Sequence, residues 1–243
     1  GDPAQAVSLA ERAASVSHDG TAIHGAKMVA AMVALAFDGP DIDTLIDGAL
    51  THIPSDCALA KMITDVRRWH ASDGDWKKTL KRIQKIHGYG IYPCGCHMIP
   101  NHALIILSLL YSEGDFHRAM MIVNTAGYDT DCNAGNVGCI LAVLGGLDAL
   151  EGGPDWRGPV ADRLYLPSAD GGRAISDAVK ESDAIVMAAH RMRKIDYNPP
   201  KNNARFHFSQ PGSVQGFVAD ESAAAVQVSN RNQQLELRTH KPT

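Results

Sequence analysis

Two aspartates separated by one residue are the strongest candidates for chemistry in this sequence. Asp129-Thr130-Asp131, followed by Cys132 and Asn133, lies at a turn that opens into a helical segment. Carboxylates at this spacing can converge on one point, and hard cations such as Mg²⁺ prefer such oxygen ligands. The partial positive charge of a helix start also helps to keep both carboxylates ionised. The alternative is that the aspartates only cap the helix and bind no metal, because aspartate is common at helix starts.

A second candidate lies between the first two expected helices, at His18-Asp19-Gly20. A histidine in such a loop can hydrogen-bond a phosphate or a ribose hydroxyl. Alternatively, Asp19 is only the N-cap of the next helix and His18 is a surface residue. The local sequence favours this second interpretation without excluding the first.

Potential metal ligands also cluster at Cys94-Gly95-Cys96-His97, with His87 and His102 nearby. Structural zinc sites usually separate paired cysteines by about two to four residues, whereas one residue separates these two, and the sequence has no second such pair. The sequence therefore favours a loop that shapes a cleft over a zinc site.

Other catalytic signatures are absent from the sequence. It contains no Gly-x-Ser-x-Gly elbow, no Gly-x-x-x-x-Gly-Lys-Ser/Thr loop, no His-Glu-x-x-His motif and no Gly-x-Gly-x-x-Gly after a strand. These absences favour chemistry carried out by carboxylates and a metal.

The composition is that of a globular protein. The 243 residues have a formal charge of -4 and are 45% hydrophobic, a balance that argues against disorder. The isoelectric point near 6.3 disfavours a nucleic-acid partner, and no apolar stretch is long enough to span a membrane. Five cysteines, an odd number, do not suggest a disulfide framework, so a reducing, cytoplasmic location is the default expectation.

Most of the chain predicts helices joined by short loops, so the expected fold class is mainly α. Helical patterns cover roughly 3–14, 21–37, 42–52, 55–71, 75–87, 101–111, 116–126, 133–145 and 175–196. Segment 101–111 is apolar almost all round, which predicts a buried central helix. The glycine- and proline-rich stretch 87–100 predicts a constrained loop, and long loops in compact domains often carry function.

Two glycines in the helix after the aspartates require an explanation. Glycine inside a helix costs about 1 kcal/mol relative to alanine, and Gly135 and Gly138 both lie there. We expect the close approach of another helix backbone to account for them.

The composition changes at Asn198-Pro199-Pro200. After it, 225–228 and 235–238 alternate in the manner of strands. The predicted organisation is a compact all-α helical domain over 1–197, followed by a β-rich tail or the start of a small β-module over 201–243.

The sequence around the two aspartates resembles the C-terminal signature of the ADP-ribosylglycohydrolases. The resemblance is carried by Gly114-Asp115-Phe116 followed by Ala-Gly-Tyr-Asp-Thr-Asp-Cys-Asn at 126–133, and it is most specific at 127–133. Further similarity lies at 1–3, 17–20 and 99–101, and the resemblance covers roughly 1–166. This family includes the activating glycohydrolase of dinitrogenase reductase and the J1 crystallins of the lens. The chain is most similar to the microbial branch with a cysteine after the second aspartate.

The resemblance implies an all-α fold around a cleft that holds two Mg²⁺ ions, with Mn²⁺ as an alternative. The implied reaction is hydrolysis of the N- or O-glycosidic bond between ADP-ribose and a protein side chain or small group. Asp129 and Asp131 match two metal ligands of the family, and Cys132 takes the position of a third, which is threonine or serine in characterised members. Thiol is a poor ligand for Mg²⁺. Either this ligand is lost, water replaces it, or the metal preference changes.

The implied partner is ADP-ribose or an ADP-ribosylated protein. His18 matches the family histidine that contacts ADP-ribose, and Asp19 follows it. Asn101 ends the similar segment 99–101, and Gly95 belongs to the loop that lies where family members line the substrate cleft. These four residues form the expected substrate-binding set.

The chain departs from the family pattern at its N-terminal end. Family members carry a Thr-Asp-Asp type metal motif and a catalytic acidic residue in an N-terminal half, and no Thr-Asp-Asp or Ser-Asp-Asp occurs here. We therefore expect the chain to be a C-terminal portion, incomplete alone, with the catalytic residue on the missing N-terminal segment. The alternative is a non-catalytic relative that binds ADP-ribose or is structural, like the crystallins. Both aspartates favour the enzyme, whereas Cys132 favours the alternative.

Overall fold

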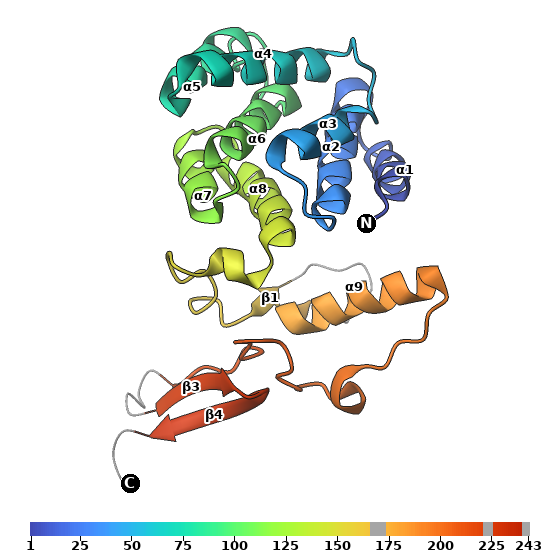
Figure 1. Ribbon diagram of the computed structural model, residues 1–243, viewed down its shortest axis with the longest axis vertical. Coiled ribbons are helices and arrows are strands. Elements are labelled where there is room, and N and C mark those ends of the chain that lie inside the picture. The colour runs from blue at the N-terminus through green and yellow to red at the C-terminus, as the bar shows by residue number, and fades with distance from the viewer. Residues whose placement is uncertain (166–173, 221–225, 240–243) are drawn as a thin grey trace. The chain divides into compact units, whose positions relative to one another are not determined.

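The computed structural model describes residues 1–165, 174–220 and 226–239. The chain divides into two compact units, Gly1–Pro154 and Asp155–Thr243 (Figure 1). The first unit consists of α1 (Pro3–Ala14), α2 (Gly20–Ala36), α3 (Ile42–Leu50), α4 (Ala58–Asp73), α5 (Trp76–Ile86), α6 (Met98–Ser112), α7 (Phe116–Thr125), α8 (Thr130–Gly145) and the 3₁₀ turn η1 (Leu147–Leu150). The mainly α fold expected from the sequence is confirmed.

Helix α6 is the central element of the first unit. Every residue from Ile99 to Ser112 is buried, which confirms the buried helix expected over 101–111. Helices α2, α3, α4, α5, α7 and α8 all contact it. Burial of one large aliphatic side chain contributes about 1.5–3 kcal/mol, and Leu104, Ile106 and Leu107 on α6 are fully buried. The core therefore fixes α6, and with it the residues of its first turn.

Helix α6 begins at Met98, three residues before the expected start. His97 is its N-cap, and the ring Nδ1 accepts a hydrogen bond from the backbone N–H of Ile99 at 3.1 Å. Pro100 therefore lies in the first helical turn, where the N–H that proline lacks has no partner within the helix. The prolines and glycines before it form the expected loop.

The glycines of α8 are not explained by a close helix backbone. Helix α7 packs against α8, but a Cβ at Gly138 would meet only side-chain atoms of Met120 and Phe116, at 3.6–3.9 Å. A Cβ at Gly135 would meet nothing within 4 Å. The expectation of close backbone approach is wrong for both positions, and nothing in the structure explains the glycine at 135.

The described residues of the second unit form one long helix, a 3₁₀ turn and two pairs of antiparallel strands. These are β1 (Arg163–Tyr165) with β2 (Ile175–Asp177), α9 (Ala178–Arg193), the turn η2 (Pro200–Asn203), and β3 (Val226–Arg231) with β4 (Gln234–Thr239). The tail strands expected near 225–228 and 235–238 are thus present, although Ala225 lies outside the described residues. Residues 175–177 form a strand rather than the expected helix start, because Asp177 caps α9 by accepting the N–H of Lys180 at 2.9 Å.

The boundary between the compact units lies at 154–155, whereas the composition changes at 198–200. Helix α9 belongs by its contacts to the second unit, and the division into 1–197 and 201–243 stays a prediction. All five cysteines are free thiols. Among the described residues, no helix is both long and apolar enough to cross a membrane.

Candidate metal centre and its pocket

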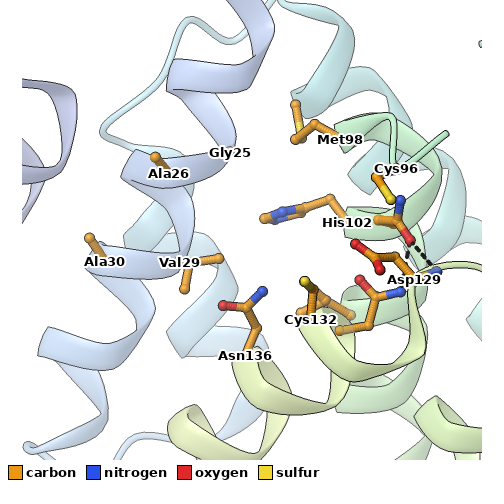
Figure 2. A pocket seen from close by; sticks show the side chains of 13 residues that line it. Gly25, Ala26, Val29, Ala30, Cys96, Met98, His102, Asp129, Cys132 and Asn136 are labelled. Carbon is orange, nitrogen blue, oxygen red and sulfur yellow. Dashed lines mark hydrogen bonds between the residues drawn. The ribbon is translucent and has the colours of Figure 1, made fainter. Parts of the chain in front are cut away.

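A pocket of about 410 Å³ in the first unit lies between α2 and the first turns of α6 and α8 (Figure 2). This volume falls within the usual range for small-molecule sites, about 300–1,000 Å³. One wall is the α2 face with Gly25, Ala26, Val29 and Ala30, and the rest is formed by Cys96, Met98, Asn101, His102, Ile105, Asp129, Cys132, Asn133 and Asn136. The first turns of two helices therefore face one cavity, and their N-terminal partial charges are positive.

The Asp129 side chain does not cap helix α8, although Asp129 is the N-cap residue. Five other N-cap aspartates accept a backbone N–H from the first helical turn at 2.6–3.0 Å: Asp2, Asp41, Asp75, Asp115 and Asp177. The Asp129 carboxylate is instead turned to the pocket, which it lines (Figure 2). The interpretation that Asp129 is only a helix cap is therefore not supported.

The three predicted metal ligands converge in the structure. One ligand atom from each of Asp129, Asp131 and Cys132 lies within 4.8 Å of the other two. The N–H of Cys132 donates to the Asp131 carboxylate at 2.9 Å. This hydrogen bond, and a second one with the Asp129 side chain, lower the pKa of Asp131. The Asp131 carboxylate therefore stays ionised at pH values where an ordinary aspartate takes up a proton.

Two thiols interact with the Asp129 carboxylate from different parts of the chain. Cys132 lies on α8, and Cys96 lies in the loop before α6. A hydrogen bond to Asp129, together with the negative charge of that carboxylate, raises the pKa of each thiol. The carboxylates of Asp129 and Asp131 and these two thiols form the donor cluster of the site. Such a concentration of negative charge and lone pairs suits a divalent cation.

A left-handed turn positions Asp129 at the start of α8. Gly127 has φ +89° and Tyr128 has φ +59°, values that glycine adopts readily and other residues rarely adopt. The Tyr128 ring packs on the Tyr89 ring with centroids 4.2 Å apart. The stacked rings join the loop before α6 to the segment that carries the aspartates.

Asn101 links the same segments through hydrogen bonds. Its Oδ1 accepts the backbone N–H of Asp129 at 3.0 Å and the side-chain amide of Asn133 at 2.9 Å. Its Nδ2 donates to the Tyr89 hydroxyl at 2.8 Å and to the His97 carbonyl at 3.0 Å. These four bonds use the full capacity of the amide. In this structure Asn101 therefore positions Asp129, and its expected contact with substrate stays a prediction.

His102 lines the pocket and has a buried ring nitrogen without a partner among the described residues. The residue is 3% exposed, and within the described residues its Nε2 has no hydrogen-bond partner. Burial lowers the pKa of His102 to about 4, so the ring is neutral at pH 7. Figure 2 shows the imidazole reaching into the pocket toward α2. A buried polar atom without a partner costs about 1–3 kcal/mol, so a molecule in the pocket that pairs with Nε2 would be stabilised there.

Replacing His102 with leucine is expected to remove a pH-dependent part of the stability. In the folded chain the imidazole stays neutral down to about pH 4, whereas in the unfolded chain it binds a proton near its ordinary pKa of about 6.5. The unfolded state therefore binds more protons between these values. The free energy of unfolding of the wild type therefore falls as the pH falls from about 6.5 to 4, by up to about 1.4 kcal/mol per pH unit.

Urea unfolding of both proteins at several pH values in this range tests that expectation. The free energy of unfolding should fall more steeply with decreasing pH for the wild type than for His102→Leu. Equal slopes would mean that His102 takes up its proton in the folded chain as easily as in the unfolded chain.

The other predicted substrate-binding residues do not line this pocket. His18 lies in an exposed turn before α2, where its Nδ1 is 2.7 Å from the Ser17 hydroxyl. Asp19 is the N-cap of α2, as the local sequence suggested, but its side chain makes no capping hydrogen bond. Gly95 is exposed, and a Cβ there would meet nothing within 4 Å. The contact of these three residues with ADP-ribose stays a prediction.

Sequence reasoning missed three parts of the pocket. Cys96 was considered only within a local zinc motif, and His102 only as a neighbour of that motif. The α2 wall carried a signal in its small residues: a Cβ at Gly25 would lie 2.7 Å from the sulfur of Met98. The glycine therefore permits the start of α6 to approach α2 closely.

Comparison with known proteins finds a family model that matches the part of the chain containing the pocket. A family model described as ADP-ribosylglycohydrolase matches residues 1–190, a range that includes the whole first unit and the donor cluster. No curated protein and no solved structure matches the chain.

Proposed function

Because the chain belongs to the ADP-ribosylglycohydrolase family, we propose that it acts in metal-dependent hydrolysis of the glycosidic bond between ADP-ribose and a protein side chain or small group. One observation carries this proposal. Asp129, Asp131 and Cys132 converge within 4.8 Å in the matched region, and the Asp129 carboxylate faces the pocket instead of capping its helix.

The residues present fit a divalent cation. Asp129, Asp131 and Cys132 would hold it, since each offers one ligand atom at this point. A bound cation would supply positive charge that polarises the ribose hydroxyls and the reacting centre. Asn101 would keep the Asp129 backbone in place through its 3.0 Å hydrogen bond. The first turns of α6 and α8 would favour the diphosphate of ADP-ribose, because helix N-termini attract anions.

Release of free ADP-ribose tests the proposal. The full chain is incubated with arginine-linked, serine-linked and small-molecule-linked ADP-ribose, with a divalent cation or with a chelator, and the product is separated by chromatography. We expect cation-dependent release from at least one linkage and none with the chelator. Binding of ADP-ribose without release from any linkage would instead identify a non-catalytic relative. Absence of both binding and release would overturn the proposal.

A further inference from the structure

The donor cluster contains sulfur, which does not suit the Mg²⁺ that the family resemblance implies. Mg²⁺ requires an octahedral shell of oxygen ligands and usually keeps several waters, whereas thiolates select softer cations such as Zn²⁺. Cys132 lies inside the group of converging ligand atoms, and Cys96, in the loop before α6, lines the same pocket as Asp129 and Cys132. Sulfur thus reaches the site from two separate elements.

The distances are compatible with a zinc site. In tetrahedral sites Zn–O is about 2.1 Å and Zn–S about 2.3 Å, so ligand atoms lie about 3.6 Å apart. The ligand atoms of Asp129, Asp131 and Cys132 lie within 4.8 Å of one another. Asp131 and Cys132 are exposed side chains, so rotation about their own bonds can close the difference. Cys96, also exposed and lining the same pocket, offers a fourth donor.

An independent observation points to a ligand in the same pocket. His102 is buried to within 3% of its surface, and among the described residues its Nε2 has no partner. The imidazole enters the cavity that Cys96, Asp129 and Cys132 line (Figure 2). Buried polar atoms are nearly always paired in folded proteins. A metal-bound water or a ligand hydroxyl in the cavity would pair this nitrogen if a small side-chain movement opened it to the cavity.

We propose that Asp129, Asp131 and Cys132, with Cys96 as the fourth donor, bind a thiophilic divalent cation of the Zn²⁺ type in preference to Mg²⁺. As each metal–sulfur bond forms, the thiol proton passes to solvent. The place of this cation in catalysis rests on the proposed function, but its binding does not. The cation preference can therefore be measured without substrate.

Titration of the full chain with Co²⁺ alone tests the preference, because thiolate ligation of Co²⁺ produces a sulfur-to-metal charge-transfer absorption. We expect this absorption in the Co²⁺-loaded wild type. Adding one equivalent of Zn²⁺ should displace Co²⁺ and remove the absorption, whereas a large excess of Mg²⁺ should leave it unchanged. Cys132→Ser replaces sulfur with oxygen at an exposed position, so it should lose most of the absorption and bind Zn²⁺ about tenfold or more weakly. Cys96→Ser should reduce the absorption further.

Cys139→Ser is the matched control, because Cys139 is an exposed thiol on the same helix that does not line the pocket. It should leave the spectrum unchanged. A charge-transfer band that survives both Cys132→Ser and Cys96→Ser, or Mg²⁺ competing as well as Zn²⁺, would overturn the inference. Zn²⁺ binding without ADP-ribose release would refute only the proposed function. Mg²⁺-dependent release without the band would refute only the zinc preference.

Discussion

Asp129→Asn is expected to abolish tight metal binding and to lower kcat/KM for ADP-ribose release by at least about 100-fold. A loss of that size corresponds to about 2.7 kcal/mol of transition-state stabilisation. The substitution removes the negative charge at the centre of the donor cluster, where Asp131 and both thiols meet the carboxylate. The shape of the side chain changes little, and the backbone N–H still donates to Asn101. Calorimetric metal titration and the release assay measure both losses.

Asp115→Asn provides the matched control for this variant. Asp115 is also an N-cap aspartate, on α7, but its carboxylate accepts the N–H of Arg118 at 2.6 Å. Asparagine caps helices about as well as aspartate, so stability, metal binding and turnover should all stay near the wild-type values. Full turnover in Asp129→Asn would contradict the assignment of Asp129 as a ligand. Loss of metal binding in both variants would mean that the effect is not specific to the pocket.

Asn101→Leu is expected to lower the free energy of unfolding by about 2–4 kcal/mol and to weaken metal binding about 10- to 100-fold. The substitution removes four side-chain hydrogen bonds, including those to the Asp129 N–H and the Asn133 amide. Asn133 is 1% exposed, and each buried unpaired group costs about 1–3 kcal/mol. Residues that orient metal ligands typically contribute about 10- to 100-fold to affinity. Urea unfolding and Co²⁺ titration, the latter under conditions where the variant is folded, measure the two effects.

Asn124→Leu separates the positioning role from a general effect of removing an amide. Asn124 lies on α7 and is exposed, and its side chain donates to the Met120 carbonyl. Surface substitutions of this kind usually change stability by less than about 0.5 kcal/mol, and metal affinity should not change. If Asn101→Leu lost stability but kept wild-type metal affinity, Asn101 would be a structural residue without influence on Asp129.

The helices were predictable because their signals are local. Asp75 and Asp115 mark helix starts through hydrogen bonds to backbone groups two or three residues ahead, and the apolar pattern of α6 follows from its burial on all sides. The short strands β1 and β2 were not predicted. Each has three residues, too few to show an alternating pattern.

The convergence of Asp129, Asp131 and Cys132 was predictable for the same local reason, since they lie within four consecutive positions. The approach of Cys96 to the same pocket and the hydrogen bonds of Asn101 to Asp129 and Asn133 were not predicted, because they depend on contacts between distant segments. The hydrogen bond from Asp129 to Asn101 spans 28 residues. A periodic pattern reports which face of a helix is buried, but it does not report which loop will lie against that face.

The division of the chain at 154–155 determines which residues would stay together if the two units were exchanged by recombination. Every residue that lines the pocket lies between Gly25 and Asn136, and Asp131 lies there too. All the residues of the candidate site therefore lie in the first unit. Recombination that exchanged the second unit would pass on the whole donor cluster intact, whereas a junction between α2 and α8 would separate α2 from the aspartates.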